Sequence, residues 1–542
     1  MSFIKITDER LNVENLRGAK YAIVLGPSSN ATKISPQNAN AGTINYLLNN
    51  VGPNVGRNRT IWLNFKCNLT VVGTGLPATA SGWAGYVGFK ALPFNRCVQV
   101  QHNINTASDT YLNYQLTDWL GHLKNHAEEV DWLENFQPDT MNTYNSASTM
   151  NPIGQFTNVP HGRGVFKNRT LGLTVSNVSA TGATFAVDIW EPLLTPFSSI
   201  PRKGQNLPAL YGIDGENIAI SSINQFSDML AFGLPTGTVT SVTCAVVDAP
   251  IYVEYVSSKN LVIPENSVSQ YSKFQRFTTQ IGTIAASSSS SASVQINSQT
   301  MPSLIALMIK KNETSRTPTD TDSYAAITSV SFQLDNGSLL LNNYSQKQLH
   351  QISYQNGLTD DWAIFSQANM EGLGGNTYGA GSILLINPSK DLSISDSLGL
   401  SNCSAGKYTL NIDVNYKNNS NANQTNMILC AYVINTAILS RTGRSYETQQ
   451  LAYTQNEINT AMREADFVDY SEFIDSKHDN LMLSGGSFSS WFSNVWNKGK
   501  AAVEKYKPLV EKGIKIAKKA KDIYDENKKK QEEGGAVKVY YH

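Results

Sequence analysis

The chain has 542 residues, an apolar fraction of 41% and a charged fraction of 16%, and its 43 basic residues balance 43 acidic ones. This length exceeds one ordinary core, so we expect two or more domains. Five scattered cysteines without CxxC spacing favour reduced thiols over a disulfide framework. No apolar signal segment follows Met1, and no run reaches the roughly 18 apolar residues of a membrane-spanning helix. These features argue against a secreted or membrane-spanning protein.

Short strand-like segments dominate the first 450 residues. They are rich in β-branched and aromatic residues, partly alternate between apolar and polar positions, and end at Gly, Pro, Asn or Asp. In chain order, the clearest are residues 60–73, 184–194, 240–256, 303–311, 382–388, 408–416 and 427–435. Their number and spacing predict an all-β protein built of sandwiches of antiparallel strands.

Two segments before the C-terminal tail have helical periodicity instead. Residues 116–136 place apolar side chains at helical spacing, and we expect this helix to lie across one end of the first sandwich. Residues 454–474 are a second, acidic candidate, with Thr454 at the N-cap position and Glu457 three residues further on.

Connections between the strands are marked by polar and turn-forming residues. The polar stretch around Pro264 separates two strand-rich halves of similar size and predicts an interdomain linker. The serine-rich residues 286–293 are predicted to form a flexible loop, because strand-like runs lie on both sides. Asp335, Asn336 and Gly337 predict a hairpin turn in which the glycine supplies a positive φ.

The sequence offers no constellation that predicts catalysis. Phosphate-binding, dinucleotide-binding, nucleophile-elbow and zinc-protease motifs are absent. His122 and His126 are four residues apart, but no third metal ligand follows at a telling spacing, so a structural or exposed role is favoured. We therefore predict a protein that is not an enzyme and has no cofactor and no metal.

The last 56 residues differ in character from the rest of the chain. From Ser487 to His542 there are 13 Lys and no Arg against 7 Asp and Glu, a net charge of +6, so the preceding residues carry −6. Apolar side chains recur at steps of three or four with lysines between them, which predicts one or two basic amphipathic helices with a kink near Pro508. The side chains singled out for contact with a partner are Trp491, Phe492, Trp496, Lys515, Lys518 and Lys519.

Three uses of this tail remain open at the level of sequence. It can pack against neighbouring protein through its apolar stripe. It can insert at a membrane surface, because Trp and Phe opposite Lys is the interfacial pattern. It can contact nucleic acid through its lysines, although the absence of Arg and the aromatic stripe fit this use less well.

Several segments resemble the double jelly-roll major capsid proteins of virophages and polinton-like viruses, which belong to the adenovirus-type capsid lineage. The resemblance is distributed over most of residues 1–486. It lies in ALPFNRCVQVQHNIN (91–105), WEPLLTPF (190–197), YSKFQRFTTQ (271–280), the strand, turn and S-x-x-x-L-x-x-x-S-x-Q-N-G element within 327–365, and INPSKDLSI (386–394). Because the likeness is spread over many segments, it identifies the family well but says little about which virus the chain comes from.

The resemblance implies two tandem eight-stranded jelly rolls with few short helices and a C-terminal amphipathic tail. The predicted parts are an N-terminal arm with the first strands (1–56), the first jelly roll (57–258), a linker (259–270), the second jelly roll (271–450), an extension (451–486) and the basic tail (487–542). Gly/Asn-rich stretches such as 40–56 are expected to be long loops. Three chains would form a pseudo-hexagonal capsomer that tiles an icosahedral shell around double-stranded DNA.

The family also offers a reading of the boundary before the tail. Leu483, Gly485, Gly486 and Ser487 match the preference of adenovirus-type maturation proteases, which accept an apolar residue, any residue and two glycines before the cut. An extended substrate strand fills a pocket with the apolar side chain, while glycines let the backbone approach the nucleophile. The alternative is that the glycine pair is only a flexible linker or a helix boundary.

Further partners and the location follow from the same resemblance. The implied partners are the chain itself, penton and minor capsid proteins, the maturation protease, and either membrane or genomic DNA at the tail. The implied location is the virion, after assembly in the host cytoplasm or nucleus without secretion. The competing class is a non-viral β-sandwich adhesin or carbohydrate-binding protein, which usually has clustered aromatic residues beside carboxylates.

Overall fold

The computed structural model describes residues 28–458, apart from 53–54, 84–86, 91, 121–122, 124–143, 146–150, 153–172, 199–208, 224–225, 233, 235, 258–265, 317–323, 336, 369–376, 393–401, 421–422 and 455. The chain divides into two compact units, Met1–Gly485 and Gly486–His542. Every described residue lies in the first unit.

The first half of this unit is a sandwich of two antiparallel sheets. Its main strands are β1 (Ser28–Ile34), β2 (Asn38–Ala39), β3 (Thr43–Leu48), β4 (Val55–Thr74), β6 (Val98–Ile104), β7 (Ala107–Tyr111), β10 (Leu173–Ser179), β11 (Gly182–Pro192), β12 (Leu210–Tyr211), β13 (Glu216–Ser222), β15 (Thr238–Asp248) and β16 (Ile251–Ser257). Sheet 1A has the order β1-β16-β4-β11-β10, with β12 and β15 also paired to β4, and sheet 1B has the order β2-β3-β13-β6-β7.

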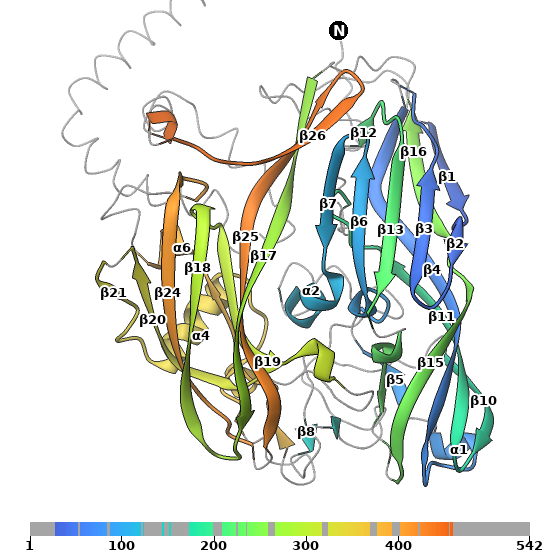
Figure 1. Ribbon diagram of the computed structural model, residues 1–542, viewed down its shortest axis with the longest axis horizontal. Coiled ribbons are helices and arrows are strands. Elements are labelled where there is room, and N and C mark those ends of the chain that lie inside the picture. The colour runs from blue at the N-terminus through green and yellow to red at the C-terminus, as the bar shows by residue number, and fades with distance from the viewer. Residues whose placement is uncertain are drawn as a thin grey trace, which may run out of the picture. The chain divides into compact units, whose positions relative to one another are not determined.

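The second half is a sandwich of the same kind. Its strands are β17 (Asn266–Ile284), β18 (Ser289–Thr300), β19 (Leu304–Lys311), β20 (Ala326–Leu334), β21 (Leu339–Leu340), β23 (Ile383–Ile386), β24 (Ala405–Lys417), β25 (Gln424–Thr442) and β26 (Ser445–Gln450). Sheet 2A has the order β17-β25-β19-β23, with β26 paired to β25, and sheet 2B has the order β18-β24-β20-β21. Figure 1 shows the two sandwiches beside each other.

Both halves have the same strand topology. Eight strands of the first half, β1, β3, β4, β6, β7, β11, β13 and β16, can be counted one to eight in chain order, as can β17, β18, β19, β20, β21, β23, β24 and β25 of the second. Each sandwich then has one sheet ordered 1-8-3-6 and a second ordered 2-7-4-5. This is the eight-stranded jelly roll, so the prediction of two tandem jelly rolls is confirmed.

Smaller elements fill the remaining described residues. These are α1 (Ala80–Trp83), β5 (Val87–Phe89), η2 (Asn95–Cys97), α2 (Asn113–Leu120), β8 (Tyr144–Asn145), β9 (Asn151–Pro152), η3 (Ser227–Met229), β14 (Leu230–Phe232), η4 (Glu313–Ser315), α4 (Gln346–Gln355), α5 (Trp362–Phe365), β22 (Thr377–Tyr378) and α6 (Pro388–Asp391). Strands β5 and β14 pair with each other, and β22 of the second half pairs with β8 of the first.

Side-chain patterns explain why the two sandwiches differ in burial. In β4, buried and exposed positions alternate towards the end of the strand, as expected where one face meets the core and one meets solvent. In β19, β23 and the middle of β25 consecutive residues are buried. Sheet 2A is therefore covered on both faces, whereas sheet 1A keeps exposed side chains on its outer face towards the end of β4.

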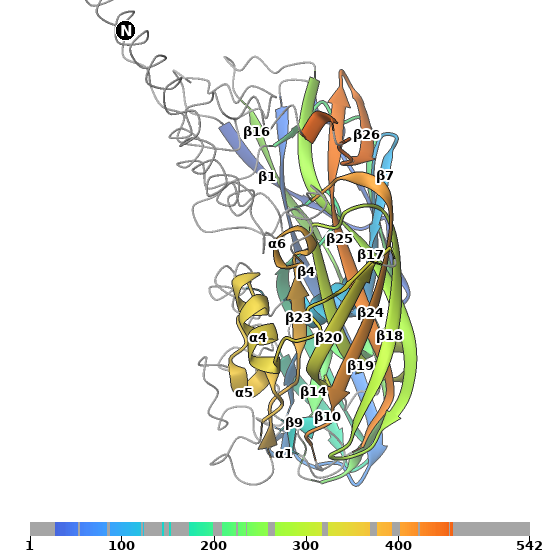
Figure 2. The same ribbon diagram turned by 90° about the vertical axis from the view of Figure 1, so that its left-hand side faces the viewer.

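Helix α4 covers the free edge of β23. Ser345 and Gln348 form a capping box at its start, which fixes where the helix begins. Ser353 accepts a hydrogen bond from the Leu385 amide at 3.1 Å, and Asn356 donates to the Leu385 carbonyl at 3.1 Å. The helix thus satisfies backbone groups that an edge strand would leave unpaired, and Figure 2 shows α4 and α5 together beside β23.

Several local predictions need correction. The serine-rich residues predicted as a loop enter β18 at Ser289, because pairing with β24 orders a stretch that carries no apolar alternation. The stretch 40–56, expected to be a long loop, contains β3 and the start of β4. Strand β17 begins at Asn266, inside the predicted linker 259–270.

The predicted hairpin between β20 and β21 is present, with a different residue in the strained position. Asp335, not Gly337, has the positive φ of 46°. Its carboxylate accepts the Thr409 amide at 2.7 Å and its own amide donates to the Thr409 carbonyl. These two bonds from β24 stabilise the left-handed conformation that aspartate tolerates.

The helical predictions hold where they can be followed. Helix α2 covers the start of predicted helix 116–136, and Thr454 and Glu457 exchange the expected capping-box hydrogen bonds. All five cysteines are free thiols, as predicted.

Candidate functional site: the junction between the sandwiches

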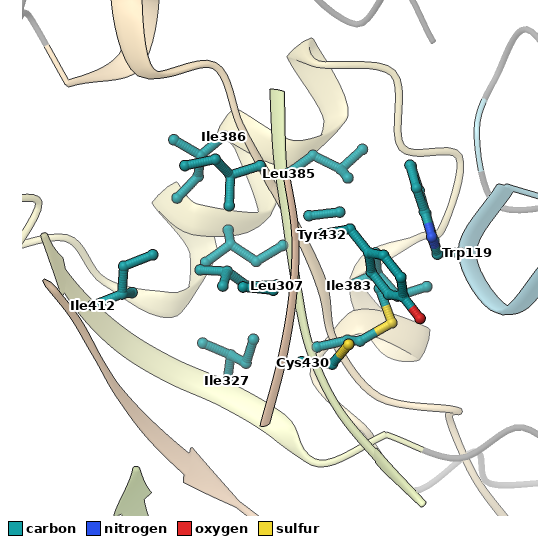
Figure 3. Close-up of a cluster of buried hydrophobic side chains, with 14 of the residues drawn as sticks. Trp119, Leu307, Ile327, Ile383, Leu385, Ile386, Ile412, Cys430 and Tyr432 are labelled. Carbon is teal, nitrogen blue, oxygen red and sulfur yellow. The ribbon is translucent and has the colours of Figure 1, made fainter. Parts of the chain in front are cut away.

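The two jelly rolls meet at a buried apolar contact. Trp119 of α2 lies 5.7 Å from the ring of Tyr432 in β25 and 6.1 Å from that of Phe274 in β17. Tyr111 at the end of β7 packs edge-on against Phe274 at 5.0 Å. Figure 3 shows Trp119 beside Tyr432 and next to the core of the second sandwich. The apolar face of α2 is therefore the part of the first sandwich that docks on the outer face of sheet 2A.

A chain of buried ion pairs crosses the same junction. Asp118 of α2 binds Lys310 of β19, Arg316 at 3.0 Å and Arg96 of η2 at 3.3 Å. Lys310 also binds Glu313 at 2.5 Å. Two charges from the first sandwich and three from the second thus lie against one another, largely shielded from solvent.

The chain of charges extends on both sides. Glu313 accepts from Arg276 at 2.9 Å, and Arg316 also reaches Asp228 at 3.5 Å. Asp228 in turn binds Lys90. We call these eight residues the junction cluster: Lys90, Arg96, Asp118, Asp228, Arg276, Lys310, Glu313 and Arg316.

The ion pairs of the junction cluster favour the charged forms of Asp118, Glu313 and Lys310. Burial opposes the charge on Asp118, but Arg316, Lys310 and Arg96 lower the pKa of its carboxyl below the usual range. Burial likewise opposes the charge on Glu313, yet Lys310 and Arg276 lower its pKa. Burial disfavours the charge on Lys310, while Asp118 and Glu313 raise its pKa. Asp118, Glu313 and Lys310 therefore stay charged around neutral pH.

Hydrogen bonds close the junction at the end formed by β7, β17 and the β25–β26 hairpin. Tyr111 donates to the Ser272 carbonyl at 2.5 Å, and Tyr271 donates to Asp109 at 2.9 Å. Tyr446 of β26 donates to the Tyr211 carbonyl at 2.5 Å and accepts from its amide at 3.1 Å. Tyr111 and Tyr446 satisfy backbone groups of the opposite sandwich and Tyr271 a carboxylate, so the junction is a specific contact.

A second polar group near the junction resembles a catalytic relay in its geometry. His102 lies 2.7 Å from Thr195 Oγ1 through Nδ1 and 2.7 Å from Glu216 Oε1 through Nε2. The carboxylate can only accept, so Nε2 carries the proton and Nδ1 accepts from the threonine hydroxyl. Arg57 pairs with Glu216 at 2.6 Å.

Burial decides what this relay can do. His102, Thr195 and Glu216 each have 0% exposure. Burial lowers the pKa of His102 more than its bond to Glu216 raises it, so the imidazole is neutral. A hydroxyl–imidazole–carboxylate chain needs substrate access to act, and this one serves to satisfy buried polar groups.

The described residues hold no group of three or more His, Cys, Asp or Glu placed to bind a metal ion. None of their helices is long and apolar enough to cross a membrane.

The sites predicted from sequence lie outside the described residues. This holds for His122 and His126, for the processing motif Leu483, Gly485, Gly486 and Ser487, and for the tail residues Trp491, Phe492, Trp496, Lys515, Lys518 and Lys519. They remain predictions.

Two jelly rolls of one topology, joined in a single chain by a buried junction, define the double jelly-roll class of protein. Residues 272–435 match the family model of the major capsid protein V20 C-terminal domain. A chain in the cryo-EM structure of the Sputnik virophage is similar, with 17% identity and a TM-score of 0.69 over 87% of this chain and 98% of that one. The crystal structure of the mavirus major capsid protein is similar with 15% identity and a TM-score of 0.64, over 85% and 98% of the two chains. No curated protein matches the sequence.

These findings confirm the predicted resemblance. The second jelly roll carries the domain of a major capsid protein, and the virophage structures share the fold of nearly the whole described chain. The chain therefore has the double jelly-roll fold of these virophage structures, and its residues 272–435 match a major capsid protein domain.

The residues of the junction were missed at the level of sequence. Lys310 follows the apolar run of β19, and Asp118 interrupts the apolar face of α2. A charged residue inside an apolar run signals a buried ion pair, but its partner lies too far along the chain to be identified from spacing.

Proposed function

We propose that this chain is a major capsid protein, that three copies of it associate around a threefold axis into a pseudo-hexagonal capsomer, and that these capsomers tile an icosahedral shell around double-stranded DNA. The observation that carries the proposal is the repetition of one jelly-roll topology in a single chain. Two lobes of the same shape per chain supply six similar lobes per trimer, and a closed ring of identical contacts is the common outcome of such repetition.

The role is structural and not catalytic. The His102 relay has no access to a substrate, and the junction cluster is used to join the sandwiches. The protein acts in the virion, after assembly in the host cytoplasm or nucleus, where penton and minor capsid proteins complete the shell.

The C-terminal tail has a separate task in this proposal. A maturation protease cuts after Gly486, and the basic amphipathic segment 487–542 acts inside the particle or on a membrane. Its charge of +6 and its aromatic stripe support contact with anionic surfaces.

Size-exclusion chromatography with light scattering tests the assembly step. The purified full-length chain should elute with three times the mass of one chain, and negative-stain images should show particles with a hexagonal outline. A monomer at every concentration tested would overturn the proposal. A monomer that binds glycans would instead favour the alternative function, an adhesin or carbohydrate-binding protein.

A further inference from the structure

Lys310 lies between two carboxylates inside the junction cluster. Its Nζ atom contacts Oδ2 of Asp118 in α2, and it lies 2.5 Å from Oε1 of Glu313 in η4. The side chains of Lys310 and Asp118 have 0% exposure, and Glu313 is also buried. A primary amine, a carboxyl group with which it can condense, and a second carboxylate that can carry a proton therefore meet at one point away from solvent.

The two oxygen atoms of Asp118 have different surroundings. Oδ1 lies 3.0 Å from Nη2 of Arg316 and 3.3 Å from Nη1 of Arg96, whereas Oδ2 faces the amine of Lys310. When an amine adds to a carboxyl carbon, negative charge develops on one oxygen and the other oxygen leaves. Two guanidinium groups at Oδ1 stabilise that charge in the way that the donors of an oxyanion hole do. The carboxyl group is thus oriented for attack by the lysine, with Oδ2 as the leaving atom.

The surroundings of the pair favour the loss of water. Trp119, next to Asp118, packs on the ring of Tyr432 at 5.7 Å, and the Lys310 amine lies 5.7 Å from the centre of the same ring. Two opposite charges buried in such a place carry a desolvation cost that a neutral amide does not have. Reacting groups that are held in contact behave as if their concentration were about 10⁵–10⁸ M. Both effects favour an amide at this position, whereas an exposed amine and carboxylate in water remain an ion pair.

We propose that Lys310 and Asp118 condense into an isopeptide bond that joins the two jelly rolls covalently. The bond from Lys310 Nζ to Asp118 Cγ forms, the bond from Asp118 Cγ to Oδ2 breaks, and one water molecule leaves. The reaction occurs once in each chain, needs no oxidant and no further reactant, and turns over no substrate. It does not depend on the proposed trimer, because all of its groups belong to one chain.

The protons balance within the same side chains, and the ion pair is the starting state. Glu313 accepts one proton from the Lys310 ammonium, and the resulting amine adds to the carboxyl carbon of Asp118. Oδ1 carries the negative charge beside Arg96 and Arg316 until the carbonyl forms again. Oδ2 receives one proton from Glu313 and a second from the lysine nitrogen, and leaves as water. Glu313 ends in its initial state and is therefore the general base of this reaction.

Mass spectrometry of the purified full-length protein tests the bond directly. The intact chain should be lighter than its sequence by the mass of one water molecule, and a digest should contain a branched peptide that joins Lys310 to Asp118. The bond connects residues 192 positions apart, so the denatured and reduced chain should also migrate differently on a gel from an unlinked chain. Lys66 and Asp188 form a half-exposed pair at 3.3 Å, and they should remain unlinked in the same digest as an internal control.

Two variants separate the amine from the base. Lys310→Arg keeps the positive charge but has no amine, so it should give no branched peptide. Glu313→Gln keeps both reacting groups and should slow bond formation about 100-fold or more, the usual contribution of a general base. The rate is followed in newly synthesised chains by the appearance of the branched peptide. Far-ultraviolet circular dichroism shows whether each variant folds.

The wild-type chain decides the proposal even if a variant does not fold. A wild-type chain of full mass after prolonged incubation at neutral pH, with separate peptides for Lys310 and Asp118, overturns it. A loss of water that maps to other residues, or that persists in Lys310→Arg, overturns it as well. Bond formation at the wild-type rate in folded Glu313→Gln overturns the assignment of Glu313 as the base. A monomeric chain that carries the bond supports this inference and overturns the proposed trimer alone.

Discussion

Asp118 and Lys310 form an ion pair with 0% exposure between helix α2 of the first jelly roll and strand β19 of the second. They are 192 residues apart in the chain. Each is also held by further partners of the opposite charge, so the pair fixes the relative position of the sandwiches through a network and not through a single contact.

Substitution of Asp118 should be severe. Asp118→Asn leaves the charges of Lys310, Arg316 and Arg96 without their shared carboxylate, which is expected to lower the free energy of unfolding by about 3–5 kcal/mol. Lys66→Gln is the control, since it removes a half-exposed pair with Asp188 at 3.3 Å and should cost no more than about 0.5 kcal/mol. Urea denaturation of both variants measures the difference, and equal losses would contradict a role for burial.

His102 should make the protein less stable in mild acid. Its pKa in the folded chain is lowered below the unfolded value of about 6.5, so the unfolded chain takes up a proton that the folded chain refuses. The contribution of the neutral His102 to the free energy of unfolding is therefore full above about pH 6.5. It falls as the pH drops towards the lowered pKa of His102 in the folded chain. The charged groups that face the ring are Glu216 and Arg57.

The comparison of wild type with His102→Gln isolates this effect. Between pH 7 and pH 5.5, wild type should lose about 1 kcal/mol more of unfolding free energy than the variant. Asp118, Glu313 and Glu216 have lowered pKa values, so their contributions are lost only below about pH 4.5 and do not enter this window. Parallel pH profiles for the two proteins would show that His102 does not titrate in this way.

Gly381 should tolerate no side chain. Its φ is +110°, and an added Cβ would lie 2.0 Å from the carbonyl oxygen of Tyr324. Gly381→Ala should therefore lower the free energy of unfolding by about 3 kcal/mol or more, through backbone strain and overpacking. Gly443→Ala is a control with a φ of +62° and open space around the added atom, and it should cost about 1 kcal/mol. Thermal unfolding of the two variants measures which one loses more stability.

The tail should bind anionic membranes. Full-length protein is expected to sediment with vesicles that contain anionic lipid and to release an entrapped dye, because Trp491, Phe492 and Trp496 insert while lysines meet the headgroups. Replacement of these three residues by alanine should abolish dye release. Persistent release would exclude the aromatic stripe as the cause. Salt-sensitive retention on DNA that is lost on Lys515, Lys518 and Lys519→Gln would favour the genome instead.

Processing should be visible in the mass of the protein from purified particles. Cleavage after Gly486 predicts a chain that ends at this residue, and Gly486→Val should block the cut because a branched side chain prevents close approach of the protease. A full-length mass in mature particles would leave Gly485 and Gly486 as a linker only.

Sequence patterns predicted the strands of the fold more completely than they predicted the contacts between the two sandwiches. The seven strand segments all fall on strands because local alternation reports directly on burial. The serines of β18 were wrongly predicted as a loop, because they are ordered by pairing with the neighbouring strand β24 and not by an apolar pattern of their own. The junction could not be predicted for a related reason: Asp118 and Lys310 are informative only as a pair, and a single sequence does not show which distant charges meet.

The junction inside the chain also has a kinetic consequence. Folding brings its two lobes together at a rate that does not depend on the concentration of the protein. Contacts between chains, in contrast, form only when copies collide, so they become frequent late, once synthesis has raised the concentration. In the proposed capsomer, joining two lobes in one chain thereby separates the formation of the building block from the closure of the ring, and lowers the number of association steps that each six-lobed ring requires.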